Sequence, residues 1–291
     1  MRRLTVGLAA VVVLVAVLRR LEAAVVVAPS ANASVEAAGE NRYPLLVNGG
    51  IRYQQVYAAS EFSALTGPEL ITQITFRPDG PAGGPFTQTI SNVQVSLSTT
   101  SAAPNGLDTT FANNPGPDNT VTYSGPITIS SADAPGPGNT RAFDVAINLQ
   151  TPFLYDPANG NLLLDVLNSD PGNHIIGVFL DAAVGYSDPV SRIVGWEGAP
   201  GATSGIASTM GLVTQFTTSP SVIPEPSILV VWSLLAALGV GCGWWRRTEV
   251  RTVAPALPLV RSTTAMSASF QHSAAGSATR GSTASSSPTR P

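Results

Sequence analysis

The chain has 291 residues, and only 11% of them are charged, less than half the usual share. Residues 41–221 carry 5 Arg and 13 Asp or Glu, a net charge of −8, whereas residues 246–291 carry 6 Arg and one Glu, a net charge of +5. The acidic body excludes a nucleic-acid-binding protein, and the single cysteine and two histidines exclude a disulfide framework and a Cys/His zinc site.

The N-terminus has the pattern of a secretory signal peptide. Arg2 and Arg3 precede fifteen uncharged residues, 4–18, a stretch that is short for a membrane-spanning helix. Arg19 and Arg20 follow this stretch directly. Two alternatives therefore stay open: a misplaced start of the reading frame, and an uncleaved segment that serves as an anchor.

Small residues mark the expected cleavage site. Ala31 and Ala33 occupy the two positions that signal peptidase requires to be small, so cleavage is predicted before Ser34. We therefore expect a signal peptide over residues 1–33 and a linker over residues 34–41.

Residues 42–219 alternate apolar and polar side chains with period two, which predicts β-strands. In 141–149, for example, Phe143, Val145, Ile147 and Leu149 fall on one face. The expected strands are 52–58, 70–77, 92–97, 120–129, 141–149, 161–168, 175–181, 191–197 and 211–217.

Loops rich in Gly and Pro, such as PDGPAGG and NNPGPDN, separate these strands, and no amphipathic helix occurs among them. The pattern predicts an all-β domain, an antiparallel β-sandwich of the jelly-roll kind. A domain of roughly 180 residues can bury a core without disulfides.

The body carries no recognisable catalytic motif. His174 is its only histidine, no G-x-S-x-G string occurs, and most acidic residues stand in turns where an Asp side chain caps its own backbone. We expect no enzymatic activity, although a pair of carboxylates that meet only in space stays an alternative.

Calcium is the one cofactor that the loops suggest. Asp118, Asp156 and Asp170 lie in loops rich in Asn, Gly and Pro, which offer the oxygen ligands that Ca²⁺ takes. Neither the EF-hand nor a nonapeptide repeat is matched. The alternative is that these Asp side chains only cap turns.

Aromatic side chains on the surface of a sandwich can stack on sugar rings. Tyr53, Tyr57, Tyr186 and Trp196 are the candidates, and Trp196 is the leading one because Gly195, Glu197 and Gly198 surround it. The alternative is that these rings fill the core.

Residues 227–245 form a run of nineteen uncharged residues, long enough to span a membrane as a helix. Trp244 and Trp245 end the run as an interfacial anchor, and Arg246 and Arg247 follow. By the positive-inside rule these arginines are expected on the cytoplasmic side, which places the body outside.

Pro224, Glu225 and Pro226 precede this run, and the two prolines predict a stiff, extended peptide at the membrane face. The order VIPEPS, apolar helix, Arg-Arg resembles the PEP-CTERM sorting signal of Gram-negative bacteria, here over residues 220–247. The resemblance implies recognition by an exosortase, a membrane enzyme thought to cut near the motif and pass the protein to the cell surface.

The body is similar, in RYQQVYAASEF, SLSTT and YDPANGNLLLDV, to the extracytoplasmic domains that often precede such signals and are sometimes called choice-of-anchor domains. This resemblance implies a fold and a location but no reaction. Residues 248–291 depart from the family pattern, which normally ends soon after the basic cluster. Their Ser, Thr, Ala and Arg content predicts a disordered tail.

The sequence thus predicts an exported, non-catalytic protein of an exopolysaccharide-associated envelope. It would be held in the inner membrane by one C-terminal helix before processing, and then be at the cell surface or outside. The expected partners are an exosortase, the membrane and an exopolysaccharide. The alternative is a calcium-assisted carbohydrate-binding or adhesive module.

Overall fold

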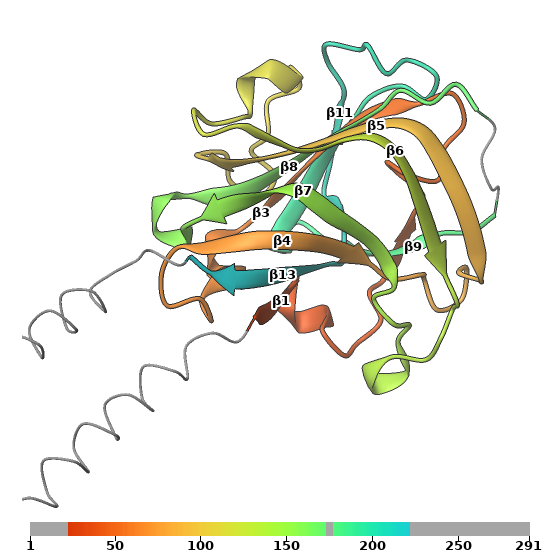
Figure 1. The fold of residues 1–291 in the computed structure, drawn as a ribbon, viewed down its shortest axis with the longest axis horizontal. Helices are drawn as coiled ribbons and strands as arrows, with labels where there is room; N and C mark the ends of the chain where they lie inside the picture. Colours follow the sequence, from red (N-terminus) through yellow and green to blue (C-terminus); the bar gives the residue numbers. More distant parts are fainter. Residues whose placement is uncertain (1–22, 173–176, 222–291) are drawn as a thin grey trace, which may run out of the picture. The chain divides into compact units, whose positions relative to one another are not determined.

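Antiparallel β-sheets are the main regular structure of the chain that the computed structural model describes, residues 23–172 and 177–221 (Figure 1). The predicted all-β, antiparallel class is confirmed. The helices of these residues are short 3-10 turns: η1 (Ser30–Asn32), η2 (Ala59–Phe62), η3 (Phe111–Asn113), η4 (Pro137–Asn139) and η5 (Pro157–Asn159).

The strands form three sheets. A four-stranded sheet has the order β1 (Ala24–Ala28), β13 (Thr214–Pro220), β4 (Glu69–Phe76), β7 (Val145–Tyr155). A six-stranded sheet has the order β11 (Ile206–Ser208), β10 (Val190–Val194), β3 (Ile51–Tyr57), β8 (Asn161–Asn168), β5 (Phe86–Thr100), β6 (Thr120–Ser131). A three-stranded sheet has the order β12 (Met210–Leu212), β9 (Leu180–Val184), β2 (Gly39–Asn41).

The main core lies between the two larger sheets, in a sandwich-like arrangement. Figure 1 shows β1, β13 and β4 in one layer and β3, β8 and β5 in the other. Ile74 and Phe216 from the first layer and Val95 and Leu164 from the second belong to one buried cluster, each with no exposed surface. The period-two pattern places these side chains inward because alternate residues of a strand face opposite sides.

The outer face of the six-stranded sheet has a smaller core of its own. The segment between β5 and β6 folds over this face and inserts Leu107 and Phe111 against Val56, Leu163 and Ile193. The sheet is therefore buried on both sides in this region, and the covering segment makes part of the surface.

Bulges move the buried face within single strands. The expected face of 70–77 was Leu70, Thr72, Ile74 and Phe76, but the register shifts between Ile71 and Gln73, so Ile71 is buried and Leu70 and Thr72 are only partly so. One extra residue in a strand exchanges the two faces, so strict alternation fails across it.

The described fold begins at Ala24, not at Arg42 as predicted. β1 lies within the expected signal peptide and pairs with β13 over five residues, and β2 occupies the end of the expected linker. β1 was not predicted from the sequence because its apolar residues were assigned to the predicted signal peptide, residues 1–33. Cleavage after Ala33 stays a prediction, but it would remove a strand of the sheet.

At other places the strand predictions were only partly right. The segment 175–181 was expected as a strand, but β9 begins only at Leu180, and 211–217 is divided into β12 and β13. β11 was not expected at all. Its three residues are too few for a period to be visible.

None of the described residues forms a helix that is long and apolar enough to cross a membrane. Several predicted features lie outside the described residues. They are the signal peptide up to residue 22, His174, the motif at 224–226, the expected span 227–245, Trp244 to Arg247, and the tail.

Candidate functional site

The three predicted calcium ligands lie in separate loops, and each accepts hydrogen bonds from backbone N–H groups. Asp156 accepts hydrogen bonds from the N–H of Ala158 at 3.0 Å and from the Asn159 amide at 3.3 Å, and so opens η5 as its N-cap. The Asx-turn alternative therefore describes what this side chain does here.

Asp170 accepts from the N–H groups of Ser91 and Gly172 at 2.5 and 2.7 Å, and Asp118 accepts from the N–H of Thr99 at 2.8 Å. Among the described residues, the three Asp side chains do not come together as a group that can hold a metal ion. Asp118 does share one hollow of about 390 Å³ with Asn159 of the Asp156 loop.

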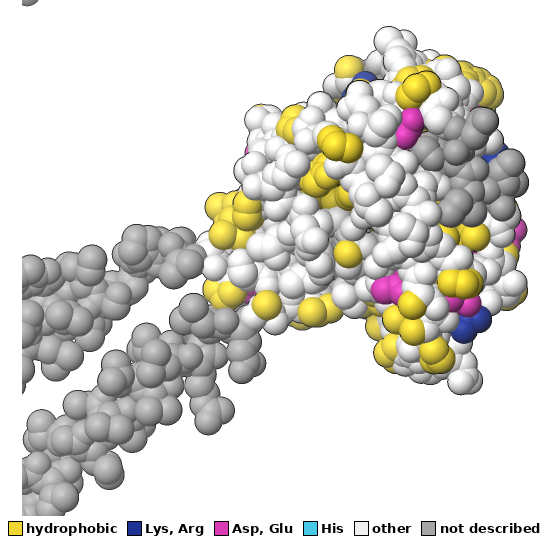
Figure 2. All heavy atoms as spheres, turned by 45° about the vertical axis from the view of Figure 1, so that its right-hand side comes forward, with side chains coloured by type: hydrophobic (Ala, Val, Ile, Leu, Met, Phe, Trp, Pro, Cys, Tyr) yellow, Lys and Arg dark blue, Asp and Glu magenta, His cyan; other side chains and the backbone are white. Residues whose placement is uncertain are grey.

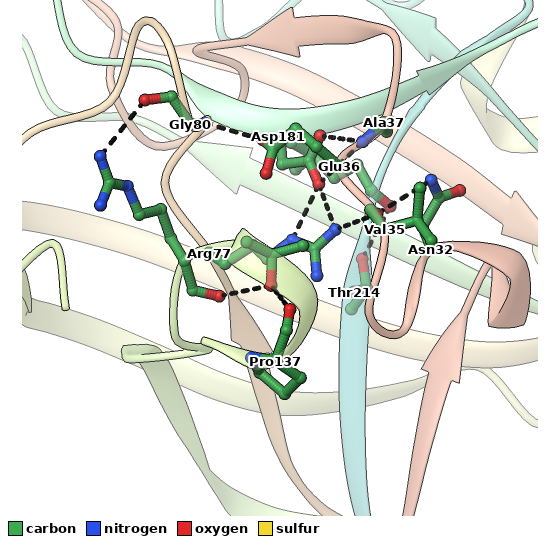
Figure 3. Close-up of polar contacts among 12 residues, drawn as sticks. Asn32, Val35, Glu36, Ala37, Arg77, Gly80, Pro137, Asp181 and Thr214 are labelled. Atoms are coloured by element: carbon green, nitrogen blue, oxygen red, sulfur yellow. Dashed lines mark hydrogen bonds and ion pairs between the residues drawn. The ribbon is translucent and has the colours of Figure 1, made fainter. Parts of the chain in front are cut away.

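A different acidic group does converge. Glu36 comes from the segment between η1 and β2, and Asp181 comes from β9 (Figure 3). Asp79 comes from the loop after β4. One carboxylate oxygen from each lies within 4.8 Å of the others. Two oxygens bound to one Ca²⁺ at about 2.4 Å are at most about 4.8 Å apart, so the spacing suits a hard cation.

Arg77 pairs with one member of this acidic group, Asp181. Its side chain is fully buried, and its Nε and Nη2 donate to Asp181 Oδ2 at 2.8 and 2.5 Å. Nη2 also donates to the carbonyl of Val35 at 2.8 Å, and the ring of Phe143 lies 5.0 Å from the guanidinium carbon. One cation thus offsets part of the charge of three carboxylates.

Backbone N–H groups bind one oxygen of each of the three carboxylates. Ala37 donates to Asp181 Oδ1 at 3.1 Å, Gly80 to Glu36 Oε1 at 2.7 Å, and Ala82 to Asp79 Oδ2 at 2.7 Å. Glu36 Oε2 is buried without a hydrogen-bond partner among the described residues. The arrangement fastens the segment before β2 onto β4 and β9, and it presents carboxylate oxygens to one point.

Burial raises the pKa of Asp181 to about 6, because desolvation of the carboxylate outweighs the hydrogen bonds and charge of Arg77. The negative charge of Glu36 acts in the same direction. The carboxyl group of Asp181 therefore titrates within a mildly acidic range.

Sequence reasoning missed this group because its members lie far apart in the chain. Asp79 was interpreted as a turn residue, and Glu36 was assigned to a linker. The one signal in the sequence was Arg77, because an arginine at the end of an apolar strand needs an acidic partner if it is buried.

The aromatic candidates divide into two classes. Tyr53 and Tyr57 are fully buried, as the core alternative expected, and burial raises the pKa of Tyr53 to about 12. Trp196 is 60% exposed and Tyr186 is 88% exposed, so both rings are open to a ligand. On the face in Figure 2, hydrophobic side chains stand in small groups among polar atoms, with few charges.

The loop of Trp196 is fixed by its neighbour. Glu197 forms an ion pair with Arg42 at 2.7 Å and accepts from the N–H of Asn48 at 3.0 Å. Trp196 is therefore an exposed ring on an anchored loop.

Comparisons of this chain with family models, with curated proteins and with solved structures give no match.

Proposed function

We propose that this chain is an exported, non-catalytic surface protein whose jelly-roll-like β-domain is delivered by its C-terminal sorting signal. The observation that carries the proposal is a three-part order: Pro224-Glu225-Pro226, then the uncharged run 227–245, then Arg246-Arg247. An exosortase is the partner, and the membrane holds the chain through one helix until processing. The processed protein is then at the cell surface or outside the cell.

The place where the fold ends supports this proposal. The last strand, β13, ends at Pro220, and Ser221 donates a hydrogen bond to the carbonyl of Pro68 at 2.9 Å. The chain divides into two units between Ile223 and Pro224. A cut at the motif therefore leaves every described strand on one product, so processing does not cost the domain its fold.

The motif is tested by replacing Pro224-Glu225-Pro226 with three alanines in a host that encodes an exosortase. Full-length protein is then expected to accumulate in the inner membrane, because the peptide that the enzyme recognises is gone. The measurement is cell fractionation with an immunoblot against the β-domain. Ser285-Ser286-Ser287 replaced by three alanines in the tail is the matched control, and unchanged processing of the motif variant would refute the proposal.

A second candidate function is carbohydrate binding or adhesion by the β-domain, assisted by calcium. The exposure of Trp196 and Tyr186 supports it, because the free energy falls when a ligand covers the apolar face of a ring that is exposed to water. The cation would be held by Glu36, Asp79 and Asp181, because Asp118, Asp156 and Asp170 do not converge. A glycan array probed with the purified protein tests this candidate.

A further inference from the structure

A groove of about 540 Å³ lies where the edge strand β11 meets β10. We name it the Tyr186 groove; among the residues that line it are Asn105, Leu107, Tyr186, Ser191, Ile206 and Thr209. Its size falls in the range of small-molecule sites in proteins, roughly 300–1,000 Å³. Trp196 is not among its lining residues.

The groove has an apolar floor and an exposed ring. Leu107 belongs to the smaller core on the outer face of the six-stranded sheet, so the floor is anchored in packed side chains. Tyr186 is 88% exposed and Ile206 is 50% exposed. The described residues therefore leave most of the Tyr186 side chain uncovered, and its ring can present a flat apolar face to a ligand.

The polar side of the groove is preorganised. The N–H of Asn105 donates to Ser191 Oγ at 2.7 Å, and its side-chain amide donates to the carbonyl of Tyr186 at 2.9 Å. The first bond ties the covering segment to β10, and the second ties it to the loop of Tyr186. Asn105 also has a φ of +64°, in the left-handed region that Asn adopts more readily than most other non-glycine residues.

The lining of the groove disfavours a cationic ligand, and the net charge of the body disfavours a polyanion. No carboxylate lines it, and its one charged residue, Arg192, has its guanidinium over the rings of Tyr43 and Tyr53, at 5.5 and 6.0 Å from their centroids. The net charge of −8 over residues 41–221 repels polyanions at long range. A cation would find no acidic partner in the groove.

We propose that the Tyr186 groove binds a segment of a neutral polysaccharide. A pyranose ring stacks its C–H face on Tyr186, where the apolar face of the sugar leaves water, and its hydroxyls exchange hydrogen bonds with the Asn105 amide and the Thr209 hydroxyl. The proposal deepens the second candidate function, on which it rests, and moves the sugar site from Trp196 to Tyr186.

The test is isothermal titration of the purified full-length protein in detergent with neutral hexasaccharides of glucose and of mannose. A hexasaccharide of galacturonic acid is the charged probe. We expect binding of at least one neutral probe and at least tenfold weaker binding of the charged one. Tyr186→Ala should weaken the neutral interaction at least tenfold, whereas Tyr186→Phe, which keeps the ring, and Trp196→Ala, which removes a ring outside the groove, should retain it.

Because Tyr186 is exposed, its replacement should leave the melting temperature unchanged, and this measurement shows that each variant is folded. Unchanged affinity in Tyr186→Ala, loss of affinity in Trp196→Ala alone, tighter binding of the charged probe, or binding of neither neutral probe would each overturn the proposal. The titration uses purified protein, so its outcome is separate from the processing of the motif variant in cells.

Discussion

Arg77 and Asp181 show how much one buried pair determines locally. Both side chains are fully shielded from solvent, and their contacts reach Val35 and Ala37 on the segment that leads into β2. Removal of one partner from a buried ion pair leaves an uncompensated charge, which typically costs 3–5 kcal/mol, about a third or more of a domain's stability. The pair therefore acts as an anchor for the N-terminal part of the fold.

The titration of Asp181 is a prediction at this scale. Its pKa in the folded protein is about 6, above the ordinary 3.8, so its contribution to stability is present below about pH 4 and is lost as the pH rises through 6. Glu36→Gln removes a negative charge that raises this pKa, so the titration midpoint of Asp181 should fall. Carboxyl ¹³C NMR measures it, with Glu69→Gln as the control, and an unchanged midpoint in Glu36→Gln would contradict the assigned cause.

Calcium binding is also tested on single residues. If Glu36, Asp79 and Asp181 hold Ca²⁺, millimolar calcium should raise the melting temperature of the wild type, because a ligand that binds the folded state stabilises it. Asp79→Asn should abolish the increase, and Asp118→Asn should retain it. The absence of any shift in the wild type would remove calcium from the second candidate function.

At the scale of elements, β1 is the strand whose status matters most. Val26 is 5% exposed and Ala28 is fully buried, and β1 covers one edge of β13. Without β1, the backbone groups on that edge of β13 lose their partners, and the core loses apolar contacts. Residues 19–23 separate the strand from the uncharged stretch 4–18, so cleavage at the predicted site after Ala33 would remove it from the sheet.

Truncation tests this role of β1. A chain that begins at Ser34 should be less stable than one that begins at Ala23 by at least about 2 kcal/mol, the order expected for exposing a buried valine and its neighbours. Urea unfolding measures the difference. Equal stabilities would show that β1 is dispensable and that cleavage after Ala33 leaves the fold unharmed.

At the scale of the whole molecule, the last strand of the β-domain ends before Pro224, where the proposed sorting motif begins. Its last strand lies between β1 and β4 in the four-stranded sheet, so both ends of the described chain meet in one sheet. The boundary between Ile223 and Pro224 separates this domain from the segment that the motif opens. The proposed processing at the motif would therefore leave all the described strands on one product.

The sequence by itself determined the class of the fold and the positions of most long strands, since strands such as β8 follow from local alternation and from Gly and Pro breakers. It also contains the motif of Pro224, Glu225 and Pro226, which is contiguous. The tertiary structure alone decided where the faces exchange at bulges, that β1 belongs to the sheet, and that Tyr186 stands over a groove. It also brought Glu36, Asp79 and Asp181 together, because contacts between distant segments depend on how the sheets pack and not on spacing along the chain.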